Sequence, residues 1–349
     1  MTAPSAQDLR RLVDALAGRP VLVVGDLMLD QFVIGRVNRI SPEAPVPIVE
    51  FDREEFKLGG AANVAHTVRA LGGTVRLVGT AGDDEPGRRL RTELARLDID
   101  LAGILVDPDR RTTTKLRVVT ARNQQVARVD YETDRDLDGP TERQLIERVE
   151  SMLGEVEAVV VSDYLKGVIT GALMQRLVAL AGDRRTPVLV DPKIPHVDLY
   201  AGATIVTPNH VEAEAATHMR IRSSEDARRA ARVFRRRSGC ASVLLTRGEH
   251  GMWLLEGEAI LGASDDSQGI LAEEQLPAVT REVADVTGAG DTVIGTIALA
   301  LAAGASQRAA ARLANHAAGV AVGKFGPVPV TRAELLTALE ATPAAESDR

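Results

Sequence analysis

Short runs of Val, Leu and Ile alternate along this chain with longer helix-like segments, and this alternation constrains the fold more than any other feature. Chains with this rhythm form a parallel sheet with helices packed on its faces. The central strands of such a sheet are buried on both sides, which accounts for their unbroken apolar sequences. We therefore predict an α/β fold. The expected central strands are residues 21–24, 75–78, 159–161, 188–190, 204–206 and 243–245.

Polar or glycine-rich residues follow each of these six strands. Gly25-Asp26 comes after the first, Ser162-Asp163 after the third, and Asp191-Pro192-Lys193 after the fourth. Ligands of open α/β sheets bind at the carboxyl ends of the strands, so we expect the six turns to converge on one cleft. Ordinary polar loops would explain any one of these turns, but six in succession favour a site.

Two stretches, residues 31–58 and 112–131, interrupt the α/β rhythm. Both alternate apolar and polar residues, as strands with one solvated face do. They predict antiparallel strands outside the main sheet. Such a small sheet would cover the cleft as a lid or pair with a second subunit, and an edge hairpin is the alternative.

The charge balance argues against polyanionic partners. Lys and Arg total 42 against 49 Asp and Glu, a net charge of −7, and aromatic residues make up only 3% of the chain. We therefore expect neither a nucleic-acid nor a membrane partner. The six arginines in the predicted helix 224–239 are interpreted as a solvated helix face. A single cysteine, Cys240, forms no internal disulfide and fits a reducing cytoplasm.

The sequence Asp-Val-Thr-Gly-Ala-Gly-Asp at 285–291 carries the strongest chemical signal, because it leads directly into a helix of small residues. Glycines let the backbone approach a ligand closely, and the free N–H groups of a helix N-terminus attract anions. Gly288, Ala289 and Gly290 are thus expected to hold a transferring phosphoryl group. Asp291 is expected to accept the proton of a substrate hydroxyl. The alternative is that Asp291 is only a favourable acid in a first helical turn.

A second glycine turn, Thr246 to Gly251, joins two predicted strands, and its backbone at Thr246, Gly248 and Gly251 is a candidate contact for nucleotide phosphates. A plain hairpin turn is the alternative. Asn209 and Glu212 lie near a helix start, where they could hold a hydrated Mg²⁺, or Asn209 could simply cap the helix. No metal is expected by tight direct ligation.

These motifs occur together with Gly59-Gly60-Ala61-Ala62-Asn63 and Thr207-Pro208-Asn209. Over roughly residues 20–335 their order and spacing resemble the ribokinase-like (PfkB) carbohydrate kinases. The resemblance implies a three-layer sandwich with a mostly parallel central sheet and a small antiparallel β lid. It also implies a single kinase domain over residues 1–349, with the lid formed by about 31–58 and 112–131.

Within this family, the chain is most similar to the kinase half of the bifunctional heptose kinases and adenylyltransferases. The resemblance implies transfer of the ATP γ-phosphoryl group to the anomeric hydroxyl of D-glycero-β-D-manno-heptose 7-phosphate, giving the 1,7-bisphosphate of lipopolysaccharide inner-core synthesis. A related kinase of another sugar or a nucleoside, and a non-catalytic sugar-phosphate sensor, remain alternatives. The segments that carry this closer resemblance are 25–30, 39–47, 114–118, 122–125 and 162–164.

The resemblance also assigns residues. It implies ATP and Mg²⁺ as cofactors, with Asp291 as the base and Gly288, Ala289 and Gly290 as the anion hole. The matching sugar-binding positions are Asp30, Gly59, Gly60 and Asn63. The matching nucleotide-binding positions are Lys193, Asn209, Glu212, Thr246, Gly248, Gly251 and Asn315.

The lid strands carry the candidate basic groups for a sugar phosphate. Lys115 and Arg117 share one face of a strand, and Arg128 joins them from the paired strand if the turn lies near Asn123. Solvated strand charge is the alternative. Exposed edges of a small sheet invite pairing, and the family resemblance suggests the same, so we expect a homodimer formed through the lid.

Two features depart from the bifunctional pattern. The chain ends at 349 without a His-x-Gly-His nucleotidyltransferase segment, so we expect no such domain and no second activity. The stretch 257–283 is longer than usual before the glycine turn. It would form part of the rim of the adenine pocket, or a surface loop.

Overall fold

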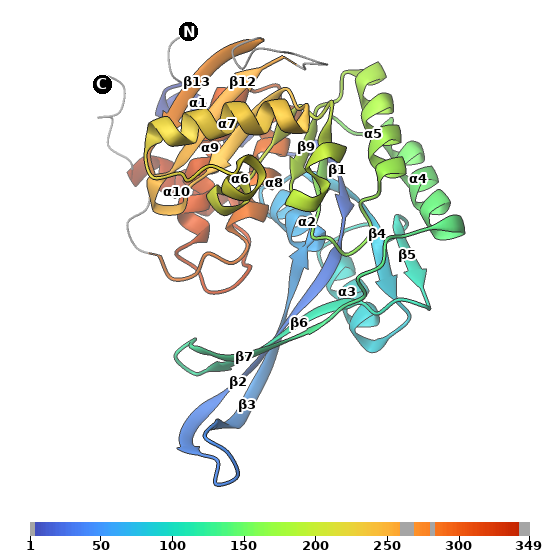
Figure 1. The fold of residues 1–349 in the computed structure, drawn as a ribbon, viewed down its shortest axis with the longest axis vertical. Helices are drawn as coiled ribbons and strands as arrows, with labels where there is room; N and C mark the ends of the chain where they lie inside the picture. Colours follow the sequence, from blue (N-terminus) through green and yellow to red (C-terminus); the bar gives the residue numbers. More distant parts are fainter. Residues whose placement is uncertain (1–3, 259–268, 280–282, 342–349) are drawn as a thin grey trace.

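The computed structural model describes residues 4–258, 269–279 and 283–341, which form a layered body with a long two-hairpin extension (Figure 1). The body contains a nine-stranded sheet of order β13-β12-β11-β10-β9-β8-β1-β4-β5. All neighbours from β11 to β5 pair in parallel, and β12 and β13 pair antiparallel at one edge. Its strands are β1 (Pro20–Gly25), β4 (Thr74–Gly82), β5 (Ile104–Asp107), β8 (Ala158–Ser162), β9 (Val188–Asp191), β10 (Ile205–Val206), β11 (Ser242–Thr246), β12 (Met252–Gly257) and β13 (Ile270–Leu276).

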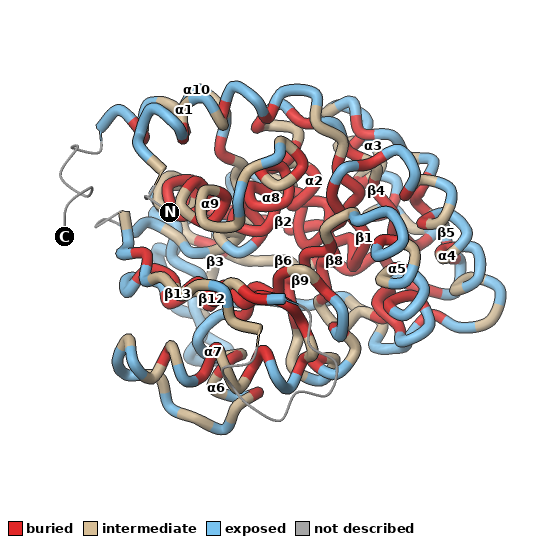
Figure 2. The backbone as a smooth tube through the Cα atoms, turned by 90° about the horizontal axis from the view of Figure 1, so that it is seen from above, coloured by how far each residue is buried: buried red, intermediate tan, exposed pale blue. Residues whose placement is uncertain are grey.

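Side chains of the central strands alternate between two apolar cores, one on each face of the sheet. Val21 and Val23 of β1 belong to one core, and Leu22 and Val24 to the other. Burial on both faces explains why the central strands are continuously apolar. Figure 2 shows buried strands in the middle and exposed residues on the outer sides of the helices. The predicted six strands and the α/β class are confirmed.

Helices cover both faces of this sheet, which gives three layers. The helices over the first core are α1 (Ala6–Ala15), α2 (Ala61–Ala70), α3 (Glu85–Arg96), α8 (Ala289–Ala302), α9 (Gln307–Ala321) and α10 (Arg332–Ala341). Those over the second are α4 (Gly139–Leu153), α5 (Gly171–Arg184), α6 (His210–Thr217), α7 (Ser224–Ser238) and the 3₁₀ turn η1 (Ile194–Tyr200). None of the helices described here combines the length and apolarity that a membrane crossing requires.

The extension is a four-stranded sheet, called the lid from here on, of order β3-β2-β6-β7. It consists of two antiparallel hairpins whose inner strands, β2 and β6, run parallel to each other. The two sequence stretches that were expected to leave the main sheet do so. The parallel joint between them depends on a pairing of distant segments, which local alternation does not reveal. The strands are β2 (Leu27–Ile40), β3 (Pro47–Gly60), β6 (Thr113–Thr120) and β7 (Gln125–Tyr131).

The turn after β4 supports the base of the lid instead of lining the cleft with the other strand ends. Asp84 accepts hydrogen bonds from the backbone N–H of Thr112 at 2.9 Å and from its hydroxyl at 2.7 Å. The same hydroxyl accepts the N–H of Gly82 at 2.8 Å. These bonds fix the point where the second lid hairpin leaves the body.

Helix α7 matches its sequence prediction, from its acidic first turn to the left-handed Gly239 that follows it. The expectation that its arginines form a solvated face is wrong in one respect. Arg235 is buried, and its guanidinium donates to the carbonyl oxygens of Ala241, Glu258 and Gly269, which lie next to the ends of β11, β12 and β13.

Within the 257–283 stretch, residues 259–268 and 280–282 lie outside the described residues. The part between them contains β13, and glutamates of β13 hold helices on both faces of the sheet. Glu273 pairs with Arg232 of α7, while Glu274 pairs with Arg308 and Arg312 of α9. The stretch therefore contributes a strand to the sheet. We had expected part of the adenine-pocket rim or a surface loop, and neither included a strand.

Candidate active site

The glycine turn before α8 forms the centre of the site. Gly288 is the N-cap residue of α8 and has a left-handed backbone with φ 80°, where a side chain would also meet the Asn63 amide at 2.9 Å. A Cβ added at Gly290 would contact nothing within 4 Å, so space lies open beside the first helical turn. The N-terminus of a 14-residue helix here faces free volume, as a phosphoryl-binding site requires.

Asp291 lies in the first turn of α8, and only 3% of its surface is exposed. Its Oδ2 accepts a hydrogen bond from Asn63 Nδ2 at 2.7 Å, and its Oδ1 accepts one from the Tyr164 hydroxyl at 2.9 Å. Burial raises the pKa of this carboxyl to about 6, against the lowering effect of the two hydrogen bonds. A carboxylate with this pKa is ionised at neutral pH and still basic enough to take a proton.

Further acidic groups surround Asp291 at the ends of β1, β8 and β9. Asp26 is almost completely buried, and burial followed by the nearby charge of Asp163 raises its pKa to about 6. Burial also raises the pKa of Asp191 well above its usual value. Polar residues at these three strand ends converge as expected, since the charge of Asp163 acts on both Asp26 and Asp191, and that of Asp291 acts on Asp191.

The expected sugar-binding residues lie where the lid meets the body. Asp30 of β2 is buried and pairs with the guanidinium of Arg117 on β6. A Cβ on Gly59 would lie 2.7 Å from Asp30 Oδ2, so a larger residue there would displace the Asp30 carboxylate. Gly60 has φ 55° and caps α2, the helix that carries Asn63 to Asp291. The structure thus brings Asp30, Gly59, Gly60 and Asn63 together.

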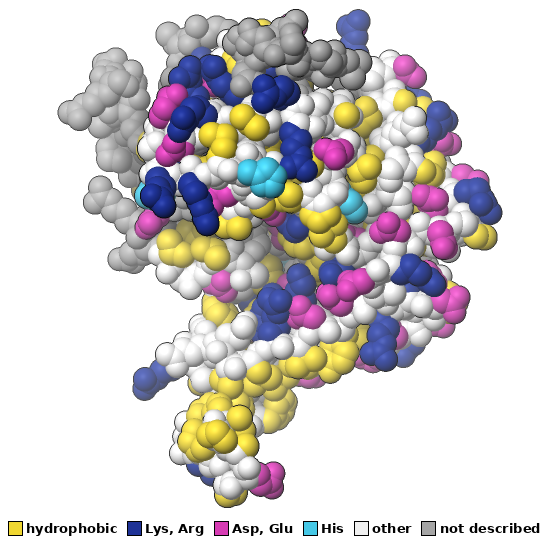
Figure 3. Space-filling model, viewed as in Figure 1, with side chains coloured by type: hydrophobic (Ala, Val, Ile, Leu, Met, Phe, Trp, Pro, Cys, Tyr) yellow, Lys and Arg dark blue, Asp and Glu magenta, His cyan; other side chains and the backbone are white. Residues whose placement is uncertain are grey.

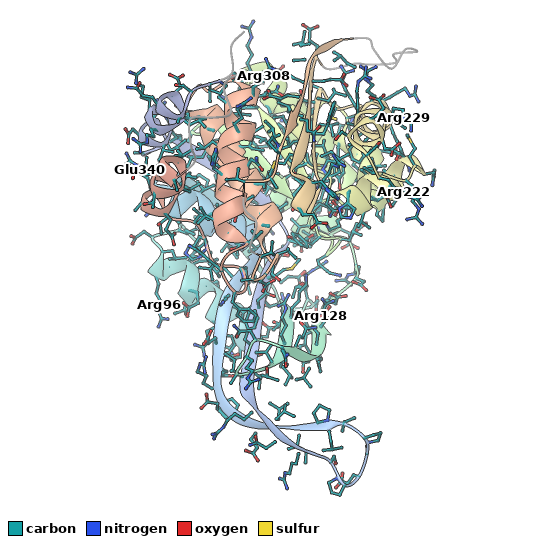
Figure 4. The ribbon with its side chains drawn as sticks, turned by 90° about the vertical axis from the view of Figure 1, so that its left-hand side faces the viewer. Arg96, Arg128, Arg222, Arg229, Arg308 and Glu340 are labelled. Carbon is teal, nitrogen blue, oxygen red and sulfur yellow. The ribbon has the colours of Figure 1, made fainter. Side chains whose placement is uncertain are left out.

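The predicted basic residues share one face of the lid. Strand pairing sets Lys115 opposite Asp30, and it sets Arg128 opposite Arg117. The Lys115 ammonium lies 5.2 Å from the centre of the Tyr164 ring, so this face is turned toward the body. Arg128 is half-exposed and pairs with Asp130 at 2.9 Å; Figure 4 labels it on the lid, below the body.

The expected nucleotide-side residues form a second group. Asn209 and Glu212 cap α6 reciprocally, each side chain accepting the other's N–H at 2.9 Å. Glu212 Oε1 also pairs with Lys193 Nζ at 2.6 Å. Thr246 lies beside Asn209 and donates its N–H to the carbonyl oxygen of Pro208 at 2.9 Å. Lys193, Asn209, Glu212 and Thr246 are therefore neighbours.

Asn209 caps helix α6, as the alternative interpretation of this residue predicted. Its side-chain oxygen already accepts the Glu212 N–H in the cap, and its amide N–H₂ cannot ligate a metal ion, so one lone pair of that oxygen is all that Asn209 offers a hydrated Mg²⁺. Across the described ranges, no three His, Cys, Asp or Glu side chains are grouped as a metal site would need.

Gly251 and Asn315 approach the same segment, residues 276–278. A Cβ on Gly251 would lie 2.0 Å from the Leu276 carbonyl oxygen, and its φ is 72°. The Asn315 amide donates to the Pro277 carbonyl oxygen at 2.7 Å. Gly248, with φ 56°, starts the 3₁₀ turn η2 (Gly248–His250) and has free space where a Cβ would lie.

Three residues of the site were not selected from the sequence. Asp26 and Tyr164 lie in turns that follow predicted strands. The polar residues after each strand indicated these turns as part of a site, but they did not single out these two side chains. Lys57 of β3 donates to the Phe325 carbonyl oxygen at 2.7 Å, close to the glycine turn. Nothing in the local pattern distinguishes Lys57 from other lid charges.

A three-layer α/β body, an open helix N-terminus next to a buried carboxylate, and a basic lid define a small-molecule kinase. The sequence model of the pfkB family carbohydrate kinases matches residues 19–332, so this chain belongs to that family. The family resemblance and the fold class expected from the motifs are confirmed.

The relatives agree with this assignment. The chain is 43% identical over 336 residues to "Bifunctional protein HldE" of Trichlorobacter lovleyi, covering 95% of this chain and 65% of the relative. The protein of the same name from Geobacter sulfurreducens is 43% identical over 319 residues, covering 91% and 62%. The chain thus spans slightly less than two thirds of the length of these relatives.

Solved structures share the fold. A putative ribokinase from Agrobacterium tumefaciens is similar with a TM-score of 0.71 and 25% identity, covering 93% of this chain and 98% of that one. Arabidopsis thaliana ribokinase, solved with ribose and ATP, has a TM-score of 0.69 at 19% identity, covering 93% and 100%.

Proposed function

We propose that this carbohydrate kinase transfers the γ-phosphoryl group of ATP to the anomeric hydroxyl of D-glycero-β-D-manno-heptose 7-phosphate. The product is the 1,7-bisphosphate, a precursor for ADP-heptose and the lipopolysaccharide inner core. The 43% identity to bifunctional relatives over most of the chain supports this substrate. The observation that carries the proposal is Asp291, a buried carboxylate beside the open glycine turn and beneath the basic face of the lid.

The chemistry follows from these groups. The anomeric oxygen attacks the γ-phosphorus, its proton passes to a carboxylate oxygen of Asp291, and the bond to the ADP oxygen breaks. The N–H groups of the Gly288–Gly290 turn hold the oxygens of the transferring group, whose charge they stabilise. Positioning and electrostatics supply most of the rate in such a transfer.

Sugar recognition is assigned to the group at the base of the lid. Asn63 Oδ1 is buried and has no hydrogen-bond partner among the described residues, so it is suited to accept a sugar hydroxyl. Asp30, next to Gly59 and Gly60, is a second acceptor. Lys115, Arg117 and Arg128 are proposed to hold the 7-phosphate, with Arg117 shared between the phosphate and Asp30.

ATP is proposed to lie along Thr246, Gly248, Gly251 and Asn315, with Lys193 near its phosphates. Mg²⁺ would neutralise charge on those phosphates, and the Glu212 carboxylate is a suitable oxygen donor for its hydration shell. Because Glu212 already pairs with Lys193 and Asn209 caps its helix, the protein offers few direct ligands. This fits an ion held mainly by water and nucleotide.

We further propose a cytoplasmic homodimer, in which the single kinase domain of residues 1–349 pairs through its lid. Hydrophobic side chains gather over the far end of the lid (Figure 3). Ile40, Val46 and Phe51 are exposed by 61%, 51% and 66%. Covering such side chains against a second lid would remove them from water.

The experiment that tests the proposed reaction is a coupled assay of ADP release over a panel of acceptors. Heptose 7-phosphate is compared with ribose, fructose, fructose 6-phosphate and a nucleoside, and the product is weighed by mass spectrometry. We expect the highest kcat/KM with heptose 7-phosphate and a product one phosphoryl group heavier. Preference for another acceptor would assign a different kinase of this fold, and no turnover with any of them would favour a sensor.

A further inference from the structure

Tyr164 occupies a central position that the proposed reaction does not yet use. It follows β8, and its hydroxyl donates to Asp291 Oδ1 at 2.9 Å. Two ammonium groups lie over its ring, Lys115 of the lid at 5.2 Å and Lys193 of the body at 5.0 Å from the ring centre. Cations over an aromatic face stabilise its position. The ring is therefore held from the lid side and from the body side.

The backbone around Tyr164 is fixed by a buried carboxylate. Asp26 accepts the N–H groups of Tyr164 at 2.7 Å and of Lys166 and Val168 at 3.1 Å each. Only 1% of Asp26 is exposed, so these bonds are shielded from water. Three donors converging on one carboxylate leave the loop little freedom.

Two further features fix the same loop. The Arg110 guanidinium donates to the carbonyl oxygen of Lys166 at 2.7 Å and also to that of Arg135. Gly167 has φ 88°, and a Cβ there would lie 2.1 Å from the Arg135 carbonyl oxygen, so the turn requires glycine. The loop that carries Tyr164 thus has one well-defined conformation before any ligand binds.

The Asp291 carboxylate is therefore held at both oxygens, by Asn63 on one and Tyr164 on the other. Each oxygen keeps a second lone pair, so the base can still accept a proton. We propose that Tyr164 is a positioning residue for Asp291, whose hydroxyl fixes the orientation of the carboxylate that receives the substrate proton. This inference rests on the proposed role of Asp291 as base.

The charges around Asp291 set the expected direction of a pH effect. Asp30, Asp191 and Lys193 are the charged neighbours, with Lys115 and Arg117 behind Tyr164 and Asp30. Burial raises the pKa of Asp291 to about 6, while hydrogen bonds from Asn63 and Tyr164 lower it. Burial also keeps the pKa of the Tyr164 hydroxyl well above its usual value, so Tyr164 stays a donor. Removing this hydroxyl must raise the pKa of Asp291.

Tyr164→Phe isolates the hydroxyl because it keeps the ring that contacts both lysines. A lost hydrogen bond to a charged group corresponds to about one pKa unit after partial compensation. We expect the acid limb of the kcat profile to move up by about one pH unit. The kcat should fall about tenfold below the limb and less at pH 8.5, with KM for both substrates within about twofold.

Tyr200→Phe is the matched control, because the Tyr200 hydroxyl donates at 2.7 Å to another buried carboxylate, Asp163. It should lower the thermal midpoint without moving the acid limb. Tyr164→Leu, which removes the ring as well, should move the limb as far as Tyr164→Phe does. An unchanged pH profile in Tyr164→Phe, a kcat loss that is equal at every pH, or a change confined to KM would each overturn the proposal.

A measurement without turnover separates this inference from the proposed function. Carbon-13 NMR of the chain labelled at its aspartate carboxyls, with the Asp291 resonance assigned through Asp291→Asn, reports the pKa of Asp291 directly. We expect that pKa to rise by about one unit in Tyr164→Phe, whether or not heptose 7-phosphate is the substrate. An unchanged pKa overturns the positioning role, whereas an inactive wild-type chain with a shifted pKa overturns the proposed function alone.

Discussion

The carboxyl edge of the large sheet and the lid contribute charged groups of opposite character. At the sheet edge, Asp26, Asp163 and Asp291 are exposed by 1%, 0% and 3%, and each accepts at least two hydrogen bonds from N–H or hydroxyl groups. On the lid, Arg53 and Arg128 are about half exposed and pair with acids of their own strands. The carboxylate proposed to react, Asp291, is thus held in place by the body, while much of the lid's charge lies near solvent.

This difference has an energetic basis. Burying a carboxylate with few opposing charges raises its pKa, which makes Asp291 a better base but costs stability above that pKa. Exposed ion pairs contribute only about 0–1 kcal/mol, so the outer lid pairs can be exchanged for contacts with a phosphate at little cost. We therefore expect substitutions in the body to affect the chemical step and substitutions in the lid to affect sugar-phosphate binding.

The largest effect is expected at the body. Asp291→Asn should lower kcat at least about a hundredfold, because it removes the proton acceptor, while KM for both substrates stays near its original value. Steady-state kinetics with heptose 7-phosphate measures both constants. Asp98→Asn, at a side chain that is 90% exposed, controls for the loss of one negative charge. Near-normal turnover by Asp291→Asn would exclude Asp291 as the base.

The second effect should appear on the lid and in KM instead of kcat. Replacing Lys115 and Arg117 together by Gln removes two charge-assisted contacts, so KM for heptose 7-phosphate should rise about tenfold or more. KM for ATP should change little. Arg53→Gln, on an exposed part of the lid, is the control. Equal changes in both KM values, or none, would exclude the lid as the 7-phosphate clamp and direct attention to Lys166 and Lys193.

A third experiment separates activity from stability at Asp291. Its folded pKa of about 6 lies above the usual aspartate value of 3.8, so the folded state is penalised above pH 6 and relieved as pH falls toward 4. The free energy of unfolding of Asp291→Asn should therefore exceed that of wild type at pH 7.5 by up to about 3 kcal/mol, the equivalent of a pKa rise of about two units. This advantage should shrink toward pH 4, while wild-type kcat falls below pH 6. Denaturant unfolding at both pH values tests it, and an equal gap at both would contradict the assignment.

Structure that depends on neighbouring residues could be predicted from the sequence, whereas contacts between distant residues could not. The central strands and the glycine turn are local signals: an apolar run of four residues, or a glycine pattern next to Asp291, specifies its own structure. The contact of Tyr164 with Asp291 joins residues 127 positions apart, and no local pattern encodes it. The β2–β6 joint is equally non-local. Sequence patterns thus predicted the elements and the proposed base, but not the groups that hydrogen-bond to that base.

Two individual residues show why local interpretations differ in reliability. Asn209 with Glu212 three positions later is a capping pattern, and the cap formed as the alternative interpretation stated. Arg235 belongs to a helix with six arginines, and its burial depends on carbonyl oxygens at the ends of three strands. Helical periodicity predicts on which face of a helix a residue lies. Whether that face is buried depends on segments that are distant in the sequence.

The smallest expected effect on catalysis concerns the outer end of the lid. Ile40 and Phe51 lie on β2 and β3, far from the Asp291 turn, and their exposure is the basis for lid pairing between two chains. Replacing both by Ser should convert a dimer into a monomer at micromolar concentration, because the apolar contact that pays for association is lost. Light scattering measures the mass, and kcat should change less than about twofold since no charged group of the cleft is altered. Val211→Ser, at a 60% exposed position of α6 in the body, should leave the mass unchanged. A wild-type chain that is monomeric and fully active would remove the dimer, and a dimer that survives both substitutions would place its interface on the body instead of the lid.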